Sequence, residues 1–187
     1  MLLEHAVKNL ISQELPVRLH IGCGSKLFDD YLNVDGEYLA GTAGVIIHDI
    51  TQPFPLEENC VDEILSVHVI EHIMRNRVQE MIVEWHRILK PGGFVAVEWP
   101  DFYKMCQEVV NNPGCLDFDA DRRLQKRTIL GIYGDNVRYP DPVMWHKWGY
   151  GESSLCRLFE SLGFSKALAE PNQHSKTTSD SRVVAYK

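Results

Sequence analysis

The 187-residue chain is predicted to form a single α/β domain around an open, mostly parallel sheet. Short runs rich in β-branched and apolar residues alternate with helical patterns or loops. Several of these runs end in Gly or Asp, which suits the carboxyl ends of parallel strands. Those ends meet at one edge of the sheet, where ligands bind. The residues predicted at this edge are Gly22, Gly24, Asp35, Asp49, His68 and Asp101.

The first half of the chain contains one predicted helix and four predicted strands. Apolar residues at helical spacing predict a helix over residues 2–12, which Pro16 ends. A buried strand follows at 17–21 and runs directly into a glycine turn. The other three strands are predicted at 31–37, 44–50 and 60–67.

The second half begins with a predicted helix over 75–89, whose apolar face includes Ile82 and Trp85. The run "KPGG" ends this helix, and a fifth strand follows at 94–100. Residues 101–135 are predicted to be helical in two pieces, and 136–150 to be irregular and aromatic. A last helix with Gly163 at its C-terminal cap and two closing strands, at 164–170 and 181–187, complete the pattern.

Composition limits the classes of partner and the compartment. A net charge of -7 argues against broad binding to nucleic acids or anionic membranes, which requires a basic surface. The five cysteines are odd in number and include no C-x-x-C pair, so a disulfide framework is disfavoured. The N-terminus does not resemble a signal peptide, and no apolar run approaches the roughly 18–20 residues that span a bilayer. We therefore expect a cytoplasmic protein; the oligomeric state is not predicted.

The glycine turn "GCGSKL" only partly matches a dinucleotide fingerprint. The third glycine of G-x-G-x-x-G would stand where Leu27 is found, which disfavours a nicotinamide oxidoreductase. Asp35 could accept both ribose hydroxyls of an adenosine, and Asp49 could meet the adenine amine. Each aspartate could instead be a turn or helix-cap residue, and the G-x-G an ordinary glycine turn. Their order after one glycine-turn strand favours an adenosine cofactor.

The sequence resembles class I S-adenosylmethionine-dependent methyltransferases, of the methyltransferase type 11 kind. The resemblance covers roughly residues 17–187. It is carried by "LHIGCGS", "LNVDGE", "HDITQPFPLEENCVDEILSVHVIEHI", "EWHRILKPGGFVAVEWPDF" and "HKWGYGESSLCRLFESLGF".

This resemblance implies a Rossmann-like, mostly parallel, seven-stranded sheet with helices on both faces and an antiparallel final strand. Within the single domain, 1–16 would be an N-terminal helix, 17–100 the cofactor-binding half, 101–150 a substrate-side insertion and 151–187 the closing helix and strands. S-adenosyl-L-methionine would be the cofactor and S-adenosyl-L-homocysteine the product. The implied cofactor contacts are Gly22, Cys23, Gly24, Asp35, Gly36, Asp49, Ile50 and His68.

Three features depart from that family pattern, one of which is the short segment between the second and third predicted strands. Leu19 and His20 stand before the glycines, where the family often carries an acidic residue. Ten residues separate Gly24 from Asp35, so the first crossover helix is expected to be very short or replaced by a loop. A non-catalytic protein that keeps the fold without the cofactor is therefore an alternative.

The stretch "SVHVIEHI" also contains H-x-x-E-H, a zinc-peptidase signature. Such a site requires a long helix and a third ligand from another helix, whereas the context here predicts the exit of the fourth strand. No metal is therefore expected, and a zinc hydrolase is the weaker alternative. We expect His68 to line the methyl-transfer pocket and Glu71 and His72 to brace the next helix. Both histidines could instead be structural.

The resemblance leaves the methyl acceptor open, and we expect a small molecule, such as a sugar or another metabolite, methylated on oxygen or nitrogen, with no nucleic acid partner. His68 and His146 are the candidate general bases. The candidate acceptor-binding residues are Asp101, Tyr103, Tyr133 and Trp148. Asp101 could instead start a helix, and the aromatic segment could be a packed apolar patch rather than a lid.

Overall fold

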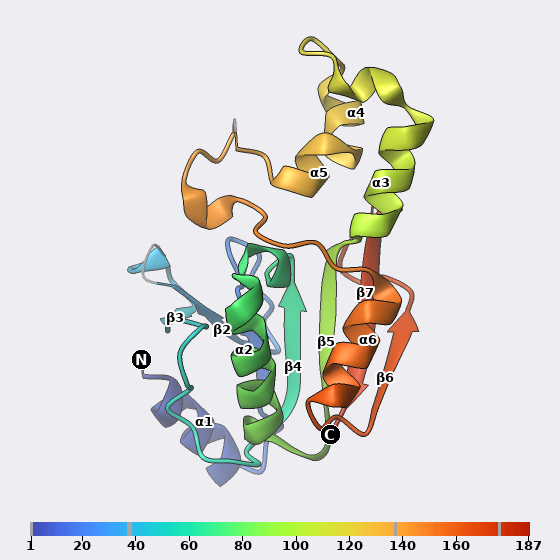
Figure 1. Ribbon diagram of the computed structural model, residues 1–187. Coiled ribbons are helices and arrows are strands. Elements are labelled where there is room, and N and C mark those ends of the chain that lie inside the picture. The colour runs from blue at the N-terminus through green and yellow to red at the C-terminus, as the bar shows by residue number, and fades with distance from the viewer. Residues whose placement is uncertain (1, 37–38, 137, 176) are drawn as a thin grey trace.

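A computed structural model of the chain describes residues 2–36, 39–136, 138–175 and 177–187. Seven strands form one sheet in the order β3-β2-β1-β4-β5-β7-β6 (Figure 1). β7 is antiparallel to both β5 and β6, and the other pairs are parallel. The strands are β1 Arg18–Ile21, β2 Leu32–Asp35, β3 Val45–Ile47, β4 Val61–Val67, β5 Leu89–Pro100, β6 Lys166–Glu170 and β7 Asp180–Tyr186. This confirms the predicted Rossmann-like, mostly parallel, seven-stranded sheet with an antiparallel final strand.

Six α-helices are described, and all of them lie in segments predicted to be helical, although the second of the two pieces predicted within 101–135 is divided at Thr128. They are α1 Leu3–Ser12, α2 Arg75–Ile88, α3 Phe102–Asn111, α4 Arg122–Arg127, α5 Ile129–Tyr133 and α6 Glu152–Ser161. Three short 3-10 turns are η2 Ile70–His72, η3 Pro113–Leu116 and η4 Pro142–Met144. None of the described helices is long and apolar enough to cross a membrane.

The fifth strand begins earlier than predicted, at Leu89 instead of residue 94. Leu89 pairs with Val61 as soon as α2 ends, and a register shift before Glu63 absorbs the "KPGG" run. Periodicity could not reveal this, because the pairing of Leu89 depends on its neighbour in space rather than on local sequence.

The apolar core is divided unequally between the two faces of the sheet. α1, α2 and α6 all contribute buried side chains to the larger cluster, in which Trp85 and Phe159 are fully buried. The second face carries a smaller cluster of Leu65, Ala96 and Val184. Phe28 and Tyr31 pack against it, and both belong to the loop that joins β1 to β2. As expected, a loop takes the place of the first crossover helix.

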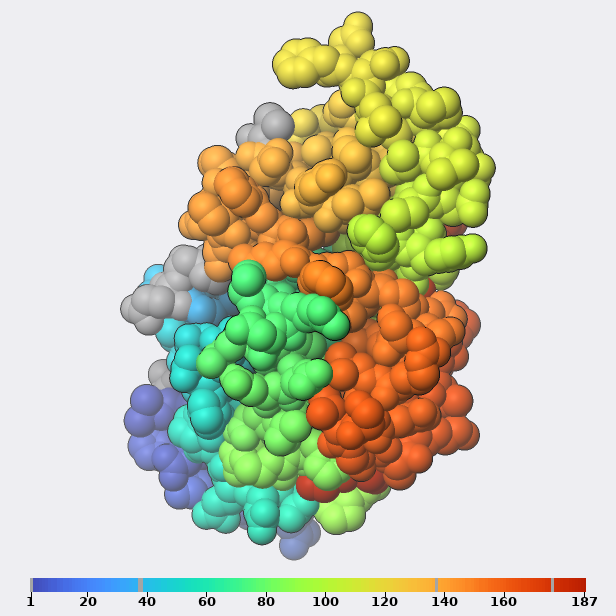
Figure 2. All heavy atoms as spheres, viewed as in Figure 1, coloured from blue at the N-terminus to red at the C-terminus, as the bar shows by residue number. Residues whose placement is uncertain are grey.

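The helical region α3–α5 stands beyond the end of the sheet to which β4 points (Figure 1). Figure 2 shows it as a mass coloured from yellow-green to light orange above the sheet region. The returning chain, residues 138–150, crosses that end of the sheet before α6 (Figure 1). The insertion therefore lies where the carboxyl ends of the parallel strands emerge.

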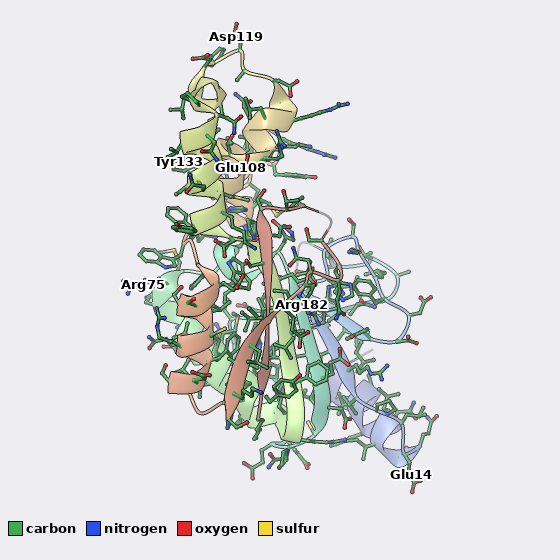
Figure 3. The ribbon with its side chains drawn as sticks, turned by 90° about the vertical axis from the view of Figure 1, so that its right-hand side faces the viewer. Glu14, Arg75, Glu108, Asp119, Tyr133 and Arg182 are labelled. Carbon is green, nitrogen blue, oxygen red and sulfur yellow. The ribbon has the colours of Figure 1, made fainter. Side chains whose placement is uncertain are left out.

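A buried ion pair joins neighbouring strands on the second face. Arg182 donates from Nη1 to Oε1 of Glu98 at 2.9 Å, and both side chains are almost completely buried. Figure 3 shows Arg182 projecting from the sheet on the side away from α6. The Glu98 carboxylate also accepts the backbone N–H groups of residues 173–175. One carboxylate thus fixes both the strand pairing and the loop between β6 and β7.

Replacing Arg182 by Met should lower the free energy of unfolding by about 3–5 kcal/mol, because Glu98 would remain charged and buried without its partner. Arg18→Met is the matched control: it removes a half-exposed pair with Glu63, which should cost about 0–1 kcal/mol. Urea denaturation of the three proteins measures both values. Equal losses of unfolding free energy in the two variants would contradict the larger contribution assigned to the buried pair.

Candidate functional site

The turn after β1 requires glycine at its first position. Gly22 has φ +71° and donates its N–H to the Val34 carbonyl at 2.8 Å. A Cβ on Gly22 would lie 2.3 Å from a methyl carbon of Val69, the residue that follows His68 after β4. The exits of the two central strands therefore approach each other more closely than any side chain permits.

Asp35 holds this turn from the end of β2. Its buried carboxylate accepts the N–H of Gly24 at 2.6 Å and of Gly36 at 2.7 Å. Hydrogen bonds to a charged acceptor are stronger than neutral ones, and each carboxylate oxygen can accept more than one. Asp35 thus shapes the glycine turn and keeps acceptor capacity for a further donor.

Asp49 follows β3 and closes a tight turn with Thr51. Its carboxylate accepts the Thr51 backbone N–H at 3.0 Å and the Thr51 hydroxyl at 2.7 Å. Partial burial opposes the charge, but these hydrogen bonds outweigh it and lower the pKa of Asp49. The residue is an ionised acceptor at neutral pH.

His68 leaves β4 with φ +56° and faces two carboxylates. Its Nε2 lies 3.0 Å from Asp180 Oδ2, and its Nδ1 lies 3.5 Å from Glu71 Oε1. Burial favours the neutral ring, but the two carboxylates prevail and raise the pKa of His68 to about 10. The imidazole therefore keeps its proton at neutral pH.

These segments line one cleft of about 680 Å³. All eight residues predicted to contact the cofactor lie in its wall. They are Gly22, Cys23, Gly24, Asp35, Gly36, Asp49, Ile50 and His68. Burial raises the pKa of Cys23 to about 12, so its thiol stays protonated and is not a nucleophile in this cleft.

The sequence did not predict the residues that form the cleft wall on the side of the insertion, residues 101–150. Asp141, Val143 and Met144 line the cleft from η4, where Asp141 caps the turn by accepting the Val143 N–H at 2.9 Å. The only local signal is the run "PDPV", which indicates a turn without saying what it faces.

The five other predicted site residues do not line the cleft. Asp101 is buried and accepts from Lys104 N, Glu152 N and the Ser181 hydroxyl at 2.9–3.2 Å, which joins α3, α6 and β7. This is the helix-start role that the sequence left open. Tyr103 and Tyr133 are largely exposed, and Tyr133 lies in the helical region above the sheet (Figure 3). The Trp148 ring packs under the Arg75 guanidinium at 4.6 Å.

The remaining predicted residue, His146, lies beside the H-x-x-E-H stretch. That stretch begins after β4 and continues into the 3-10 turn η2, so it is the strand exit that the context predicted and not part of a long helix. Ligand atoms of Glu71, His72 and His146 lie within 4.8 Å of one another. Burial lowers the pKa of His146, which therefore favours its neutral form.

Residues 37–97 match the family model described as "Methyltransferase domain". Among curated relatives, the chain is 20% identical over 161 residues to the tRNA N(3)-cytidine methyltransferase METTL2 of Mus musculus. That alignment covers 84% of this chain but only 37% of the relative, so the chain spans well under half of the relative's length.

Solved structures share the whole fold. A SAM-dependent methyltransferase from Archaeoglobus fulgidus superposes with a TM-score of 0.60 at 16% identity, covering 98% of this chain and 93% of that one. Human N-acetylserotonin methyltransferase in complex with SAM gives 0.57 at 13%, covering 92% and 47%. At such identities the similarity establishes the fold. The family match within this fold confirms the resemblance to type 11 methyltransferases that the sequence indicated.

Gly22→Ala should destabilise the protein more than Gly24→Ala. Both glycines have positive φ, which costs an alanine about 1–2 kcal/mol. A Cβ on Gly24 meets nothing within 4 Å, whereas at Gly22 it also displaces the stiff, branched Val69. Chemical denaturation of the two variants gives the difference. Equal losses of unfolding free energy in the two variants would show that the close approach of the two strand exits does not restrict the residue at position 22.

Proposed function

We propose that this chain binds S-adenosyl-L-methionine in the cleft and transfers its methyl group to an acceptor that enters beside η4. The observation that carries the proposal is the convergence of four strand exits on one cavity. In open α/β sheets this edge is where nucleotide-like ligands bind.

Each strand exit offers chemistry suited to one part of the cofactor. The side-chain-free turn at Gly22–Gly24 leaves room for the methionine part. The spare acceptor capacity of Asp35 suits the ribose hydroxyls, and ionised Asp49 with Ile50 suits adenine.

The reaction is an in-line displacement. The bound cofactor would supply an electrophilic methyl group: a bond would form from the acceptor atom to the methyl carbon as the carbon–sulfur bond breaks to leave a neutral thioether, and the acceptor proton would pass to a base or to water. The cofactor supplies the reactivity, and the protein supplies alignment and an apolar surround. Val69, Ile73 and Met144 provide apolar wall. His68 is proposed to flank the reacting methyl rather than to accept the proton, because both its ring nitrogens already face carboxylates.

We propose a small molecule as the acceptor. The cleft is concave, and η4 forms one of its walls, which fits the general form of small-ligand sites. The similarity in fold to N-acetylserotonin methyltransferase supports this class.

A nucleic acid acceptor is the second candidate. A relative is named a tRNA methyltransferase, so the expected absence of a nucleic acid partner has no support from the comparisons. Four basic residues also gather on α4 beyond the cleft: Arg122, Arg123, Lys126 and Arg127.

Calorimetric titration of the purified protein with S-adenosyl-L-homocysteine should show binding. Asp35→Ala should weaken it by about 1–3 kcal/mol, the range for losing a charged hydrogen-bond partner. Asp35→Asn keeps an acceptor for the Gly24 N–H, so this variant distinguishes a loss of ribose binding from a change in the shape of the turn. Asp30→Ala, on the exposed loop, is the neutral control. A folded wild-type protein that fails to bind at millimolar ligand would refute the proposal.

The two acceptor classes can be separated with methyl-labelled cofactor. Label should pass to a small-molecule extract and not to total tRNA, and the double variant Arg123→Glu, Lys126→Glu should retain this activity. Label in tRNA that disappears in the double variant would instead favour the second candidate, because reversing two charges weakens phosphate contacts.

A further inference from the structure

Glu71 is a buried carboxylate that accepts no hydrogen bond from the residues that the structure describes. Its side chain is 2% exposed, and neither oxygen has a hydrogen-bond partner among the described residues. Two imidazole nitrogens lie near it, His68 Nδ1 at 3.5 Å and His72 Nε2 at 3.9 Å. A buried charge is costly unless it is paired with donors or binds a cation.

His146 lies 74 residues after His72 in the chain but close to Glu71 and His72 in space. Lys147 and Trp148 donate their backbone N–H groups to the Glu71 carbonyl at 2.7 and 3.3 Å. These bonds fasten the irregular segment onto η2 and bring the ring of His146 edge-on to that of His72, with 4.8 Å between centroids. The proximity is therefore fixed by backbone contacts and does not depend on side-chain placement alone.

Both imidazoles are oriented through their Nδ1 atoms. His72 Nδ1 lies 3.3 Å from the Trp145 carbonyl, and His146 Nδ1 lies 2.8 Å from the Gly131 carbonyl. Because a carbonyl only accepts, each Nδ1 must donate, and each neutral ring keeps its lone pair on Nε2. Metal-binding histidines are commonly held in this way by a second hydrogen bond.

We propose that Glu71, His72 and His146 form a binding site for one divalent transition-metal ion of the zinc class. Two imidazole nitrogens and one carboxylate oxygen are a known ligand set for zinc with an open position. Ligand atoms around tetrahedral zinc lie roughly 3.3–3.5 Å apart. Atoms already within 4.8 Å of one another reach that spacing by small side-chain rotations.

The site adjoins the cleft because His72 belongs to both. A cation there would offer its open coordination position to an oxygen or nitrogen of the methyl acceptor. This role rests on the proposed function. The existence of the cation site does not rest on it. His68 stays outside the ligand set, since its Nε2 is bonded to Asp180. The arrangement also differs from that of a peptidase, because Glu71 is a ligand here and not a general base beside the metal.

The test uses cobalt(II) as a spectroscopic probe. The protein, freed of metal by chelator dialysis, should bind one equivalent with the visible absorption of a low-coordinate complex, and zinc(II) should displace it. His72→Gln and His146→Gln should each weaken binding roughly tenfold or more. His86→Gln on α2, which packs against Phe164, is the matched control and should bind as wild type. Failure of the wild-type protein to bind one equivalent, or unchanged binding by His146→Gln, would overturn the site.

Folding and cofactor binding are followed in the same samples. Glu71→Gln removes a buried charge and is a third variant of the site. If it does not fold, the conclusion rests on the two histidine variants. Circular dichroism and titration with S-adenosyl-L-homocysteine should match wild type in His146→Gln. A wild-type protein that binds cobalt but no S-adenosyl-L-homocysteine would overturn the proposed function alone; the reverse result would overturn the cation site alone.

Discussion

The close approach of the exits of β1 and β4 is the constraint on which the site depends. Parallel pairing of these two strands ends both at one edge of the sheet, and only a residue without a side chain fits at Gly22 against Val69. The floor of the cleft is therefore backbone, and the side chains that face the cleft come from the neighbouring exits. Asp35 completes this floor by holding the amide of Gly24, so the turn and the second strand form one unit.

Five buried carboxylates are described: Asp180 pairs with His68, and the other four differ in the hydrogen bonds that they accept. Asp35, Glu98 and Asp101 each accept two or more hydrogen bonds, chiefly from backbone N–H groups. Glu71 accepts none within the described residues. Three of these groups therefore serve the architecture. Glu71 instead has imidazoles beside it, and it carries the proposal of a cation site.

The shortened crossover from β1 to β2 is compensated locally. Phe28 and Tyr31 cover the second face in place of a helix, and Phe28 lies against His174 in the loop before β7. Lys26 donates to the His174 carbonyl at 3.0 Å, and the Glu98 carboxylate accepts the backbone N–H of His174. The cofactor-side loop and the closing strands thus support each other, although about 150 residues separate them.

Local sequence determined the order of the strands, the bounds of α1 and α2 to within one residue, and the cleft wall from Gly22 to His68. These features follow from hydrophobic periodicity, turn residues and the rule that parallel strands end at one edge, all of which are local or topological. Only the tertiary structure decided the rest. Asp101 faces three elements instead of the cleft, η4 supplies the far wall, and His146 meets Glu71 through backbone bonds of the irregular segment. No periodic pattern encodes such contacts, because they depend on how a loop without regular structure returns across the sheet.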